Sequence, residues 1–256
     1  MRNKWLSAGL AAALVLSMAA GNGFAVRVSA AESEIQTEQS SGTEEDTLVV
    51  RVAKDIGDMN PHTMNSQMYA QNWVYESLVS LENGEIVPEL AESWEISEDG
   101  LTYTFHLREG VTFSDGSAFN SEIAQKNIEA VKRHADGYSF LQSLNLLESI
   151  ETPDDLTLVL NLSSPCNSLL NDFTFSRPLV MLGEAGFPGE GDPYDNGITE
   201  PVGTGMWVLK EYVADQYALF ERNENYWGGE AFLQIFKGGC DSRRKYGGEF
   251  PESRGN

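Results

Sequence analysis

Residues 91–119 constrain the fold of this chain most, because almost every position in them has a structural explanation. Apolar and polar residues alternate on both sides of a turn at residues 97–100, where Gly100 can take positive φ. The alternating residues are Trp94, Ile96, Leu101, Tyr103, Phe105 and Leu107. We therefore predict a β-hairpin with one buried face. A helix should follow it, beginning at Ser121 and capped by Asn120.

Other periodic segments surround this hairpin. Period-two alternation predicts strands over residues 48–53 and 156–162, and a second hairpin over residues 206–221. Apolar residues at helical spacing predict a helix over residues 67–81, and the turn residues 82–85 follow it. Mixed helices and strands of this kind indicate an α/β fold.

The first thirty residues have the features of a secretory signal peptide. Arg2 and Lys4 give a basic start, residues 6–20 are apolar, and residues 28–30 are small where a signal peptidase would cleave. The alternative is a retained membrane anchor, which usually needs roughly 20 apolar residues. We therefore predict that residues 1–30 direct export and are removed.

The segment that follows is predicted to be a linker. Residues 19–22 resemble a lipoprotein signal in which Asn22 stands where the acylated cysteine would be, so we expect no lipid anchor. Residues 31–46 are acidic and almost without large apolar residues, which is typical of a flexible segment. Folding should begin at Thr47, and the mature protein should lie in a periplasmic or cell-wall space.

The charge balance excludes some partners. The chain has 256 residues, with 17 Lys and Arg against 39 Asp and Glu, and a formal net charge of -22. This acidity disfavours nucleic acid and anionic membrane surfaces and would attract a cationic ligand. The alternative explanation is a solvated acidic surface with no bearing on a site.

Five blocks of sequence occur in a specific order. They are NPH at residues 60–62 with YESLV at 75–79, VPELAESW at 87–94, DGLTYTFHLREGVTFSDG at 99–116, PVGTG at 201–205 and RNENYW at 222–227. Their wording and spacing resemble the extracytoplasmic solute-binding proteins of peptide and nickel ABC transporters, solute-binding protein family 5. The resemblance covers about residues 48 to 230.

The resemblance implies a lobe of the periplasmic-binding-protein-like class II fold over residues 47–231. Members of this family have a second lobe, which this chain would lack through C-terminal truncation. Residues 232–256 depart from the pattern, gain basic residues and glycines, and show no periodicity, so we expect an aberrant, disordered tail. Since ligands bind between two lobes, we expect impaired binding.

Within the family, the wording favours the nickel-type branch. Residues 60–76, 176–179 and 222–228 carry this likeness. It implies an exported, monomeric binding component that delivers nickel, as a small chelate with carboxylate ligands, to ABC transporter permease subunits. It implies no resident cofactor. A di- or oligopeptide ligand is the alternative within the same family.

The resemblance also implies ligand-binding residues. Arg177 occupies the position of an arginine that pairs with carboxylates, and a guanidinium presents a fork that suits this role. Met68 with Tyr69, and Phe140 in place of a tryptophan, would contact the ligand. The alternatives are a structural ion pair for Arg177, a core position for Met68 and simple packing for Phe140.

Metal and catalytic signals are sparse. His62 lies in a loop that the resemblance places near the cleft, so it is a candidate metal contact, with an ordinary loop residue as the alternative. No zinc-type pattern, nucleophile elbow, phosphate loop or HExxH pair occurs, and we predict that the protein is not an enzyme. Whether Cys166 and Cys240 form a disulfide stays open.

Overall fold

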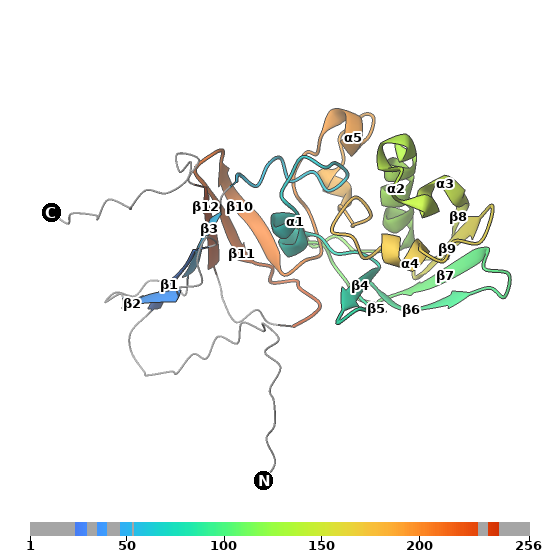
Figure 1. Cartoon of the computed structure of the whole chain (residues 1–256), viewed down its shortest axis with the longest axis horizontal. Coiled ribbons are helices and arrows are strands. Elements are labelled where there is room, and N and C mark those ends of the chain that lie inside the picture. Colours follow the sequence, from blue (N-terminus) through green and yellow to red (C-terminus); the bar gives the residue numbers. More distant parts are fainter. Residues whose placement is uncertain (1–23, 30–34, 40–46, 53, 230–234, 241–256) are drawn as a thin grey trace, which may run out of the picture.

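The fold combines two larger sheets with helices between and beside them (Figure 1). The computed structural model describes residues 24–29, 35–39, 47–52, 54–229 and 235–240, and side chains within residues 54–229. One sheet has the strand order β10-β11-β12-β3-β1-β2, another has the order β6-β7-β9-β8, and β4 pairs with β5 alone. Helix α1 and the β4-β5 hairpin lie between the two larger sheets (Figure 1). The predicted mixed α/β class is confirmed.

The strands are short and mostly antiparallel to their neighbours. Their bounds are β1 Phe24–Ser29, β2 Ile35–Gln39, β3 Thr47–Val52, β4 Val79–Glu82, β5 Glu85–Pro88, β6 Ala91–Ile96, β7 Thr102–Leu107, β8 Leu147–Asp154, β9 Thr157–Leu162, β10 Trp207–Val213, β11 Tyr217–Arg222 and β12 Ile235–Cys240. Strand β3 is parallel to both of its neighbours, β1 and β12. The predicted hairpins β6-β7 and β10-β11 and the predicted strands β3 and β9 are all present.

The helices are also short. Their bounds are α1 Met68–Val74, α2 Ser121–Lys132, α3 Gln142–Leu146, α4 Leu169–Asp172 and α5 Pro193–Asn196, with 3₁₀ turns η1 Ala135–Tyr138 and η2 Glu184–Gly186. The predicted Asn120 cap is confirmed, because its side chain accepts a hydrogen bond from the Ile123 amide at 3.0 Å. In the part of the chain that the structure describes, no helix is both long and apolar enough to cross a bilayer.

Strands β7 and β9 build the main core. Alternate residues of both strands point inward, so their burial follows the period of two that the sequence shows. Phe105 is fully buried, and its ring lies 5.8 Å from that of Phe173. Helix α2 covers β8 and β9 with Ile123, Ile128 and Val131. The strands that the sequence pattern predicts most clearly, β7 and β9, therefore form the centre of the hydrophobic core.

Helix α1 is shorter than the sequence predicts. It ends at Val74, and the next residues pair with a distant segment instead of continuing the helix. The backbone carbonyl of Glu76 accepts a hydrogen bond from the Met181 amide at 2.9 Å, and Ser77 forms an antiparallel β-bridge with Val180. This tertiary pairing outweighs the local helical spacing, so the expected helix over residues 75–81 is wrong and β4 forms there.

A glycine contact fixes the end of α1. The amide of Gly205 donates to the Val74 carbonyl at 2.9 Å, and a Cβ atom at Gly203 would overlap that same carbonyl oxygen. The PVGTG block therefore has glycines where two backbone segments meet. Close backbone packing therefore explains the glycines of this block without reference to a ligand.

Three strands lie where the sequence predicts no folded structure. β1 falls within residues 1–30, β2 within residues 31–46, and β12 within residues 232–256. The flexible linker and the disordered tail are thus at odds with β2 and β12. Strand pairing satisfies backbone hydrogen bonds whatever the side chains, and apolar periodicity does not report it. Residues 1–23, 30–34, 40–46, 53, 230–234 and 241–256 lie outside the described residues, and the boundaries proposed there stay predictions.

Candidate functional site

Arg177 lies where three segments that are far apart in sequence, residues 64–68, 138–140 and 174–178, come together. Its guanidinium donates to the carbonyl oxygen of Ser66, which joins two segments that are far apart in sequence. The Arg177–Pro178 peptide bond is cis. In residues 54–229, the ion pairs of Lys and Arg side chains involve Lys126, Arg133, Lys210 and Arg222, and none involves Arg177. The structure therefore does not support the structural ion pair that was the alternative for Arg177.

Large apolar side chains are exposed next to this arginine. Met64 and Met68 flank Ser66 in sequence and are 43% and 49% exposed. Phe140 is 54% exposed and Phe175 is 45% exposed. Neither Met68 nor Phe140 is a core residue, so the core alternative for Met68 does not apply. Phe140 does pack against neighbouring rings, so simple packing remains the alternative for it. We call Met64, Met68, Phe140, Phe175 and Arg177 the cationic face.

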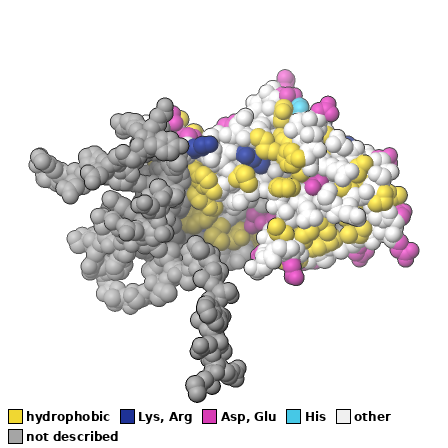
Figure 2. Space-filling model, viewed as in Figure 1, with side chains coloured by type: hydrophobic (Ala, Val, Ile, Leu, Met, Phe, Trp, Pro, Cys, Tyr) yellow, Lys and Arg dark blue, Asp and Glu magenta, His cyan; other side chains and the backbone are white. Residues whose placement is uncertain are grey.

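The face seen in Figure 2 shows this mixture of types. Hydrophobic side chains gather beside a few basic groups, with acidic groups mostly toward the rim of the described surface (Figure 2). The three segments that form the cationic face, residues 64–68, 138–140 and 174–178, contain no aspartate or glutamate. In a chain with 39 acidic residues, this local exclusion leaves Arg177 without a nearby negative charge from these segments.

A row of aromatic rings leads from the cationic face to α5. Phe140 lies 6.1 Å from Phe175 and 6.3 Å from Tyr138, both edge to face. Tyr138 lies 6.0 Å from Tyr194, which stacks on His134 at 4.1 Å. These distances are typical of favourable aromatic pairs. The row gives Phe140 neighbours on two sides while its own ring stays exposed.

Tyr138 connects this row to the interior. Its hydroxyl donates to the carbonyl oxygen of His62, and burial raises the pKa of Tyr138 well above its ordinary value. The nearby positive charge of Arg177 acts on that pKa in the opposite direction. Tyr138 is therefore a neutral support beneath the cationic face rather than a proton donor to a ligand.

Tyr69 does not share the exposure of its neighbour Met68. Its hydroxyl donates to the Lys54 carbonyl at 3.3 Å, and its ring lies 5.2 Å from Trp73. Trp73 in turn contacts Phe220 of β11 at 5.2 Å. The ring thus belongs to the packing between α1 and the β10-β11 hairpin, and its assignment as a ligand contact stays a prediction.

His62 is inside the protein rather than on the cationic face. It is 1% exposed, its Nε2 lies 2.9 Å from Asn127 Oδ1, and its ring packs on Phe187 at 5.9 Å. Burial lowers the pKa of His62 to about 4, so the ring is neutral at physiological pH. This environment suits a structural histidine, and its role as a metal contact stays a prediction.

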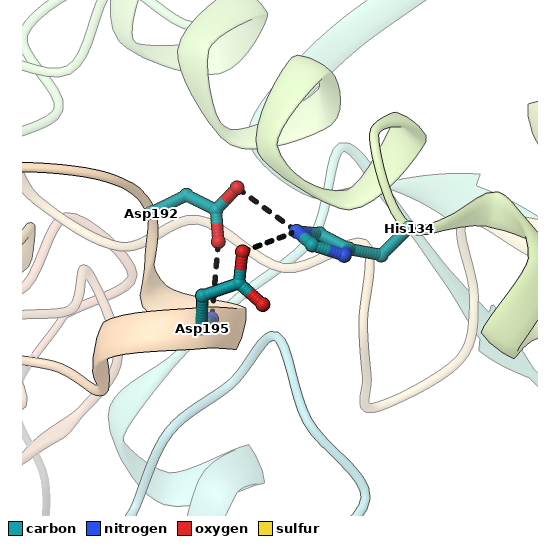
Figure 3. Close-up of side chains that lie close together, drawn as sticks. All are labelled: His134, Asp192 and Asp195. Carbon is teal, nitrogen blue, oxygen red and sulfur yellow. Dashed lines mark hydrogen bonds and ion pairs between the residues drawn. The ribbon is translucent and has the colours of Figure 1, made fainter.

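A second polar cluster joins the end of α2 to α5. His134, Asp192 and Asp195 point toward one another (Figure 3), and His134 Nε2 lies 2.9 Å from Asp192 Oδ2. Asp192 Oδ1 accepts the amides of Tyr194 and Asp195, and Oδ2 also accepts from Arg133 at 3.1 Å. Those bonds lower the pKa of Asp192 against the opposing effect of burial.

The hydrogen-bond partners of Asp192 indicate whether this cluster is a metal site or a structural ion pair. A metal ion on Asp192 Oδ2 would compete with the Arg133 guanidinium, which already binds that oxygen, while Asp192 Oδ1 is engaged by two backbone amides. Asp195 adds a third oxygen donor, but its side chain is 65% exposed. The geometry is that of an ion-paired helix cap. Sequence reasoning missed it because residues 134 and 192 meet only in the folded chain.

A third cluster holds two carboxyl groups below the surface. Glu76 accepts from Thr204 Oγ1 and Trp227 Nε1, both at 2.8 Å, and burial raises its pKa. Glu89 accepts from the Ser77 amide at 3.1 Å. Burial first, and then the charge of Glu76, raises the pKa of Glu89 to about 8. Arg108 lies over the Trp227 ring at 4.4 Å and bonds the Glu89 carbonyl.

This third cluster explains two of the sequence blocks. Thr204 belongs to PVGTG, Trp227 to RNENYW, and both bind the carboxylate of Glu76 in YESLV. The blocks that carry the family resemblance therefore hold the lobe together. None of the five blocks contains a residue of the cationic face, whereas residues 60–76 and 176–179, which carry the nickel-type likeness, contain three.

Comparison with known proteins gives the family. The pattern of the bacterial extracellular solute-binding proteins, family 5 middle, matches residues 85–236, more than half of the chain. The nickel-binding periplasmic protein of Escherichia coli is 38% identical over 176 residues, which are 68% of this chain and 33% of that protein. A protein of Brucella ovis named as an ABC transporter peptide-binding protein is 35% identical over 178 residues, again 68% and 33% of the two chains.

Solved structures agree. The crystal structure of NikA from Brucella suis in complex with Fe(III)-EDTA is similar with a TM-score of 0.73 and 35% identity. The match covers 77% of this chain and 39% of that one. This chain spans about a third of the length of the curated relatives it matches. Those relatives are solute-binding proteins rather than enzymes, and this chain belongs to solute-binding protein family 5.

Proposed function

We propose that residues 47–231 form the first lobe of the extracytoplasmic substrate-binding component of an ABC importer. We further propose that its ligand is nickel carried as a small chelate with carboxylate groups. The observation that carries this proposal is Arg177, a partly buried guanidinium without a described carboxylate partner, in a face with exposed Met68 and Phe140. Such a group has donors left for an anion.

The chemistry of the face suits a carboxylate-bearing ligand. A guanidinium can bind a carboxylate with two parallel hydrogen bonds, and exposed thioether and aromatic groups can cover the apolar part of a chelate. The names of two relatives support this class, one as a nickel-binding protein and one as a complex with Fe(III)-EDTA, an iron chelate with carboxylate arms. The ligand is thus an anion although the protein is acidic.

A peptide is the second candidate ligand. The Brucella ovis relative is named as a peptide-binding protein, and the C-terminal carboxylate of a peptide could also pair with Arg177. The two candidates differ in what else they need. A peptide also needs partners for its backbone, whereas a chelate needs only a compact, partly apolar surface.

Titration of the full chain with nickel–EDTA and with trialanine tests the two candidates. We expect saturable binding of nickel–EDTA, weaker than micromolar because the chain spans about a third of its relatives' length. Arg177→Gln should weaken it at least about tenfold, the effect of losing a charge-assisted pair. The matched control Arg222→Gln removes a guanidinium that is paired with Glu224 and should leave affinity unchanged.

Other results would change the proposal. Equal affinity in Arg177→Gln would exclude this arginine as the anchor. Binding of trialanine without binding of nickel–EDTA would favour the peptide. Micromolar affinity for either probe would contradict the expected impairment.

The cellular setting is part of the same proposal. We propose an exported monomer without lipid attachment that contacts ABC permease subunits in a periplasmic or cell-wall space. The relatives named as periplasmic and ABC transporter proteins support export and the transporter partner. Intact mass of the protein recovered from its host checks the setting. We expect removal of residues 1–30 and no acyl chain.

A further inference from the structure

Phe175 is an exposed ring that no predicted role explains. It lies two residues before Arg177, its ring packs edge to face on Phe140 at 6.1 Å, and 45% of it is exposed. Phe173 in the same segment is 2% exposed and packs in the core against Phe105. The segment therefore turns one phenylalanine inward and holds the other at the surface next to a cation.

The surroundings of Phe175 distinguish it from an isolated surface residue. Single exposed apolar side chains are common and need no explanation. Here, however, Phe175, Phe140, Met64 and Met68 belong to segments that the Arg177–Ser66 hydrogen bond and the Phe140–Phe175 contact bring together. A clustered apolar surface around one guanidinium provides both an apolar contact area and a charge.

Charge indicates what could cover this surface. Residues 64–68, 138–140 and 174–178 contain one charged side chain, Arg177, and no carboxylate. A cationic or purely apolar occupant would leave the guanidinium without an anion, and a small hydrophilic anion would leave both rings in water. An anion with an attached apolar group satisfies both parts of the face.

We infer that Phe175 is a further ligand-contacting residue, and that with Phe140 it makes the site select carboxylates that carry an apolar group. This inference rests on the proposed function, because it uses Arg177 as the carboxylate anchor. It adds the part of the ligand that must lie beyond the carboxylate. The ring of Phe175 covers that apolar group, and Arg177 holds the charge.

Two probes with the same carboxylate head group isolate this contribution. Succinate and benzylsuccinate differ only in an aromatic substituent, so their affinity ratio measures apolar contact. For the full chain we expect benzylsuccinate to bind about tenfold more tightly, as measured by ligand-observed NMR titration. Phe175→Ser should reduce this preference about fivefold and leave succinate affinity unchanged.

Control variants separate the contact from general damage. Ile96→Ser removes an apolar side chain of similar exposure, 48%, from the β6-β7 hairpin and should leave the preference intact. Phe175→Tyr keeps the ring and should retain the preference. Unchanged thermal melting of Phe175→Ser would show that the fold is preserved.

The outcomes distinguish this inference from the proposed function. An unchanged preference in Phe175→Ser overturns the inference, even if Arg177→Gln weakens both probes and thereby supports the anchor. A lost preference in Phe175→Ser with unchanged affinities in Arg177→Gln supports the aromatic contact and overturns the anchor. Failure of the full chain to bind either succinate probe, while nickel–EDTA still binds, overturns the inference and leaves the proposed function standing.

Discussion

The β7-β9 core and the cationic face use the same kinds of side chain in opposite ways. In the core, Phe105 is fully buried between paired strands whose apolar residues alternate. On the cationic face, Phe140 and Phe175 project from irregular loops and remain about half exposed. The paired strands therefore supply stability, whereas the loops place apolar groups where a ligand can reach them.

The largest expected effect is a loss of stability when a phenylalanine of the β7-β9 core is truncated. Phe105→Ala should lower the free energy of unfolding by about 3–5 kcal/mol, because it leaves a cavity beside Phe173. The matched change Phe140→Ala should cost less than about 0.5 kcal/mol, since its ring is 54% exposed. Urea unfolding of both variants checks the difference. Equal losses would mean that Phe140 is a packing residue.

A buried amide should give the second largest effect. Asn127 donates to the carbonyls of Ile123 and Leu182 at 2.8 and 2.9 Å and accepts from the Leu182 amide at 2.8 Å. Asn127→Ala removes the side-chain acceptor of the Leu182 amide and the partner of His62 Nε2, so we expect a loss of about 2–3 kcal/mol. Hydrogen exchange at the Leu182 amide should accelerate. Protection equal to that of the unchanged protein would contradict this role.

The α5 cap should contribute less. Asp192→Asn keeps the shape of the side chain but removes the charge that pairs with Arg133 and His134, and we expect a loss of about 1–2 kcal/mol. Asp195→Asn is the control, because its carboxylate is 65% exposed and should contribute less than about 0.5 kcal/mol. Thermal unfolding measures both. An increase in melting temperature on adding zinc or nickel, abolished in both variants, would instead indicate a metal site.

The last prediction concerns a pH dependence near Glu76 and Glu89 and not a loss of stability at one fixed pH. The pKa of Glu89 is raised to about 8 from 4.5, so the folded protein binds more protons than the unfolded chain between these values. Its contribution to stability is thus fully present below pH 4.5 and is lost as the pH rises through 8. Glu89→Gln should flatten this decline in urea midpoints measured from pH 5 to 9. Parallel profiles for the two proteins would refute a raised pKa.

The sequence predicts the core better than the cationic face, for a physical reason. The β6-β7 hairpin, β9 and the Asn120 cap follow from local spacing, and each is present. The end of α1 does not, because the backbone of residues 76–77 pairs with residues 179–181. Local periodicity carries no information about such pairing.

The candidate site depends even more on distant contacts. Family resemblance indicated Arg177, Met68 and Phe140, and the structure exposes the two apolar residues near the arginine. Nothing in the sequence separates Phe175 from Phe173, since both follow the same short helix α4. Only the packing of Phe173 on Phe105 shows which ring is structural.

The position of β3 has a consequence for how the chain can be cut or joined. This strand lies between β1 and β12, so residues 47–52 hydrogen-bond with residues 235–240 across nearly two hundred positions. Removing β12 would expose a row of unpaired backbone groups on β3 and on β11. A shortened version meant for crystallisation should therefore retain β3 and β12, because an unpaired strand edge favours self-association.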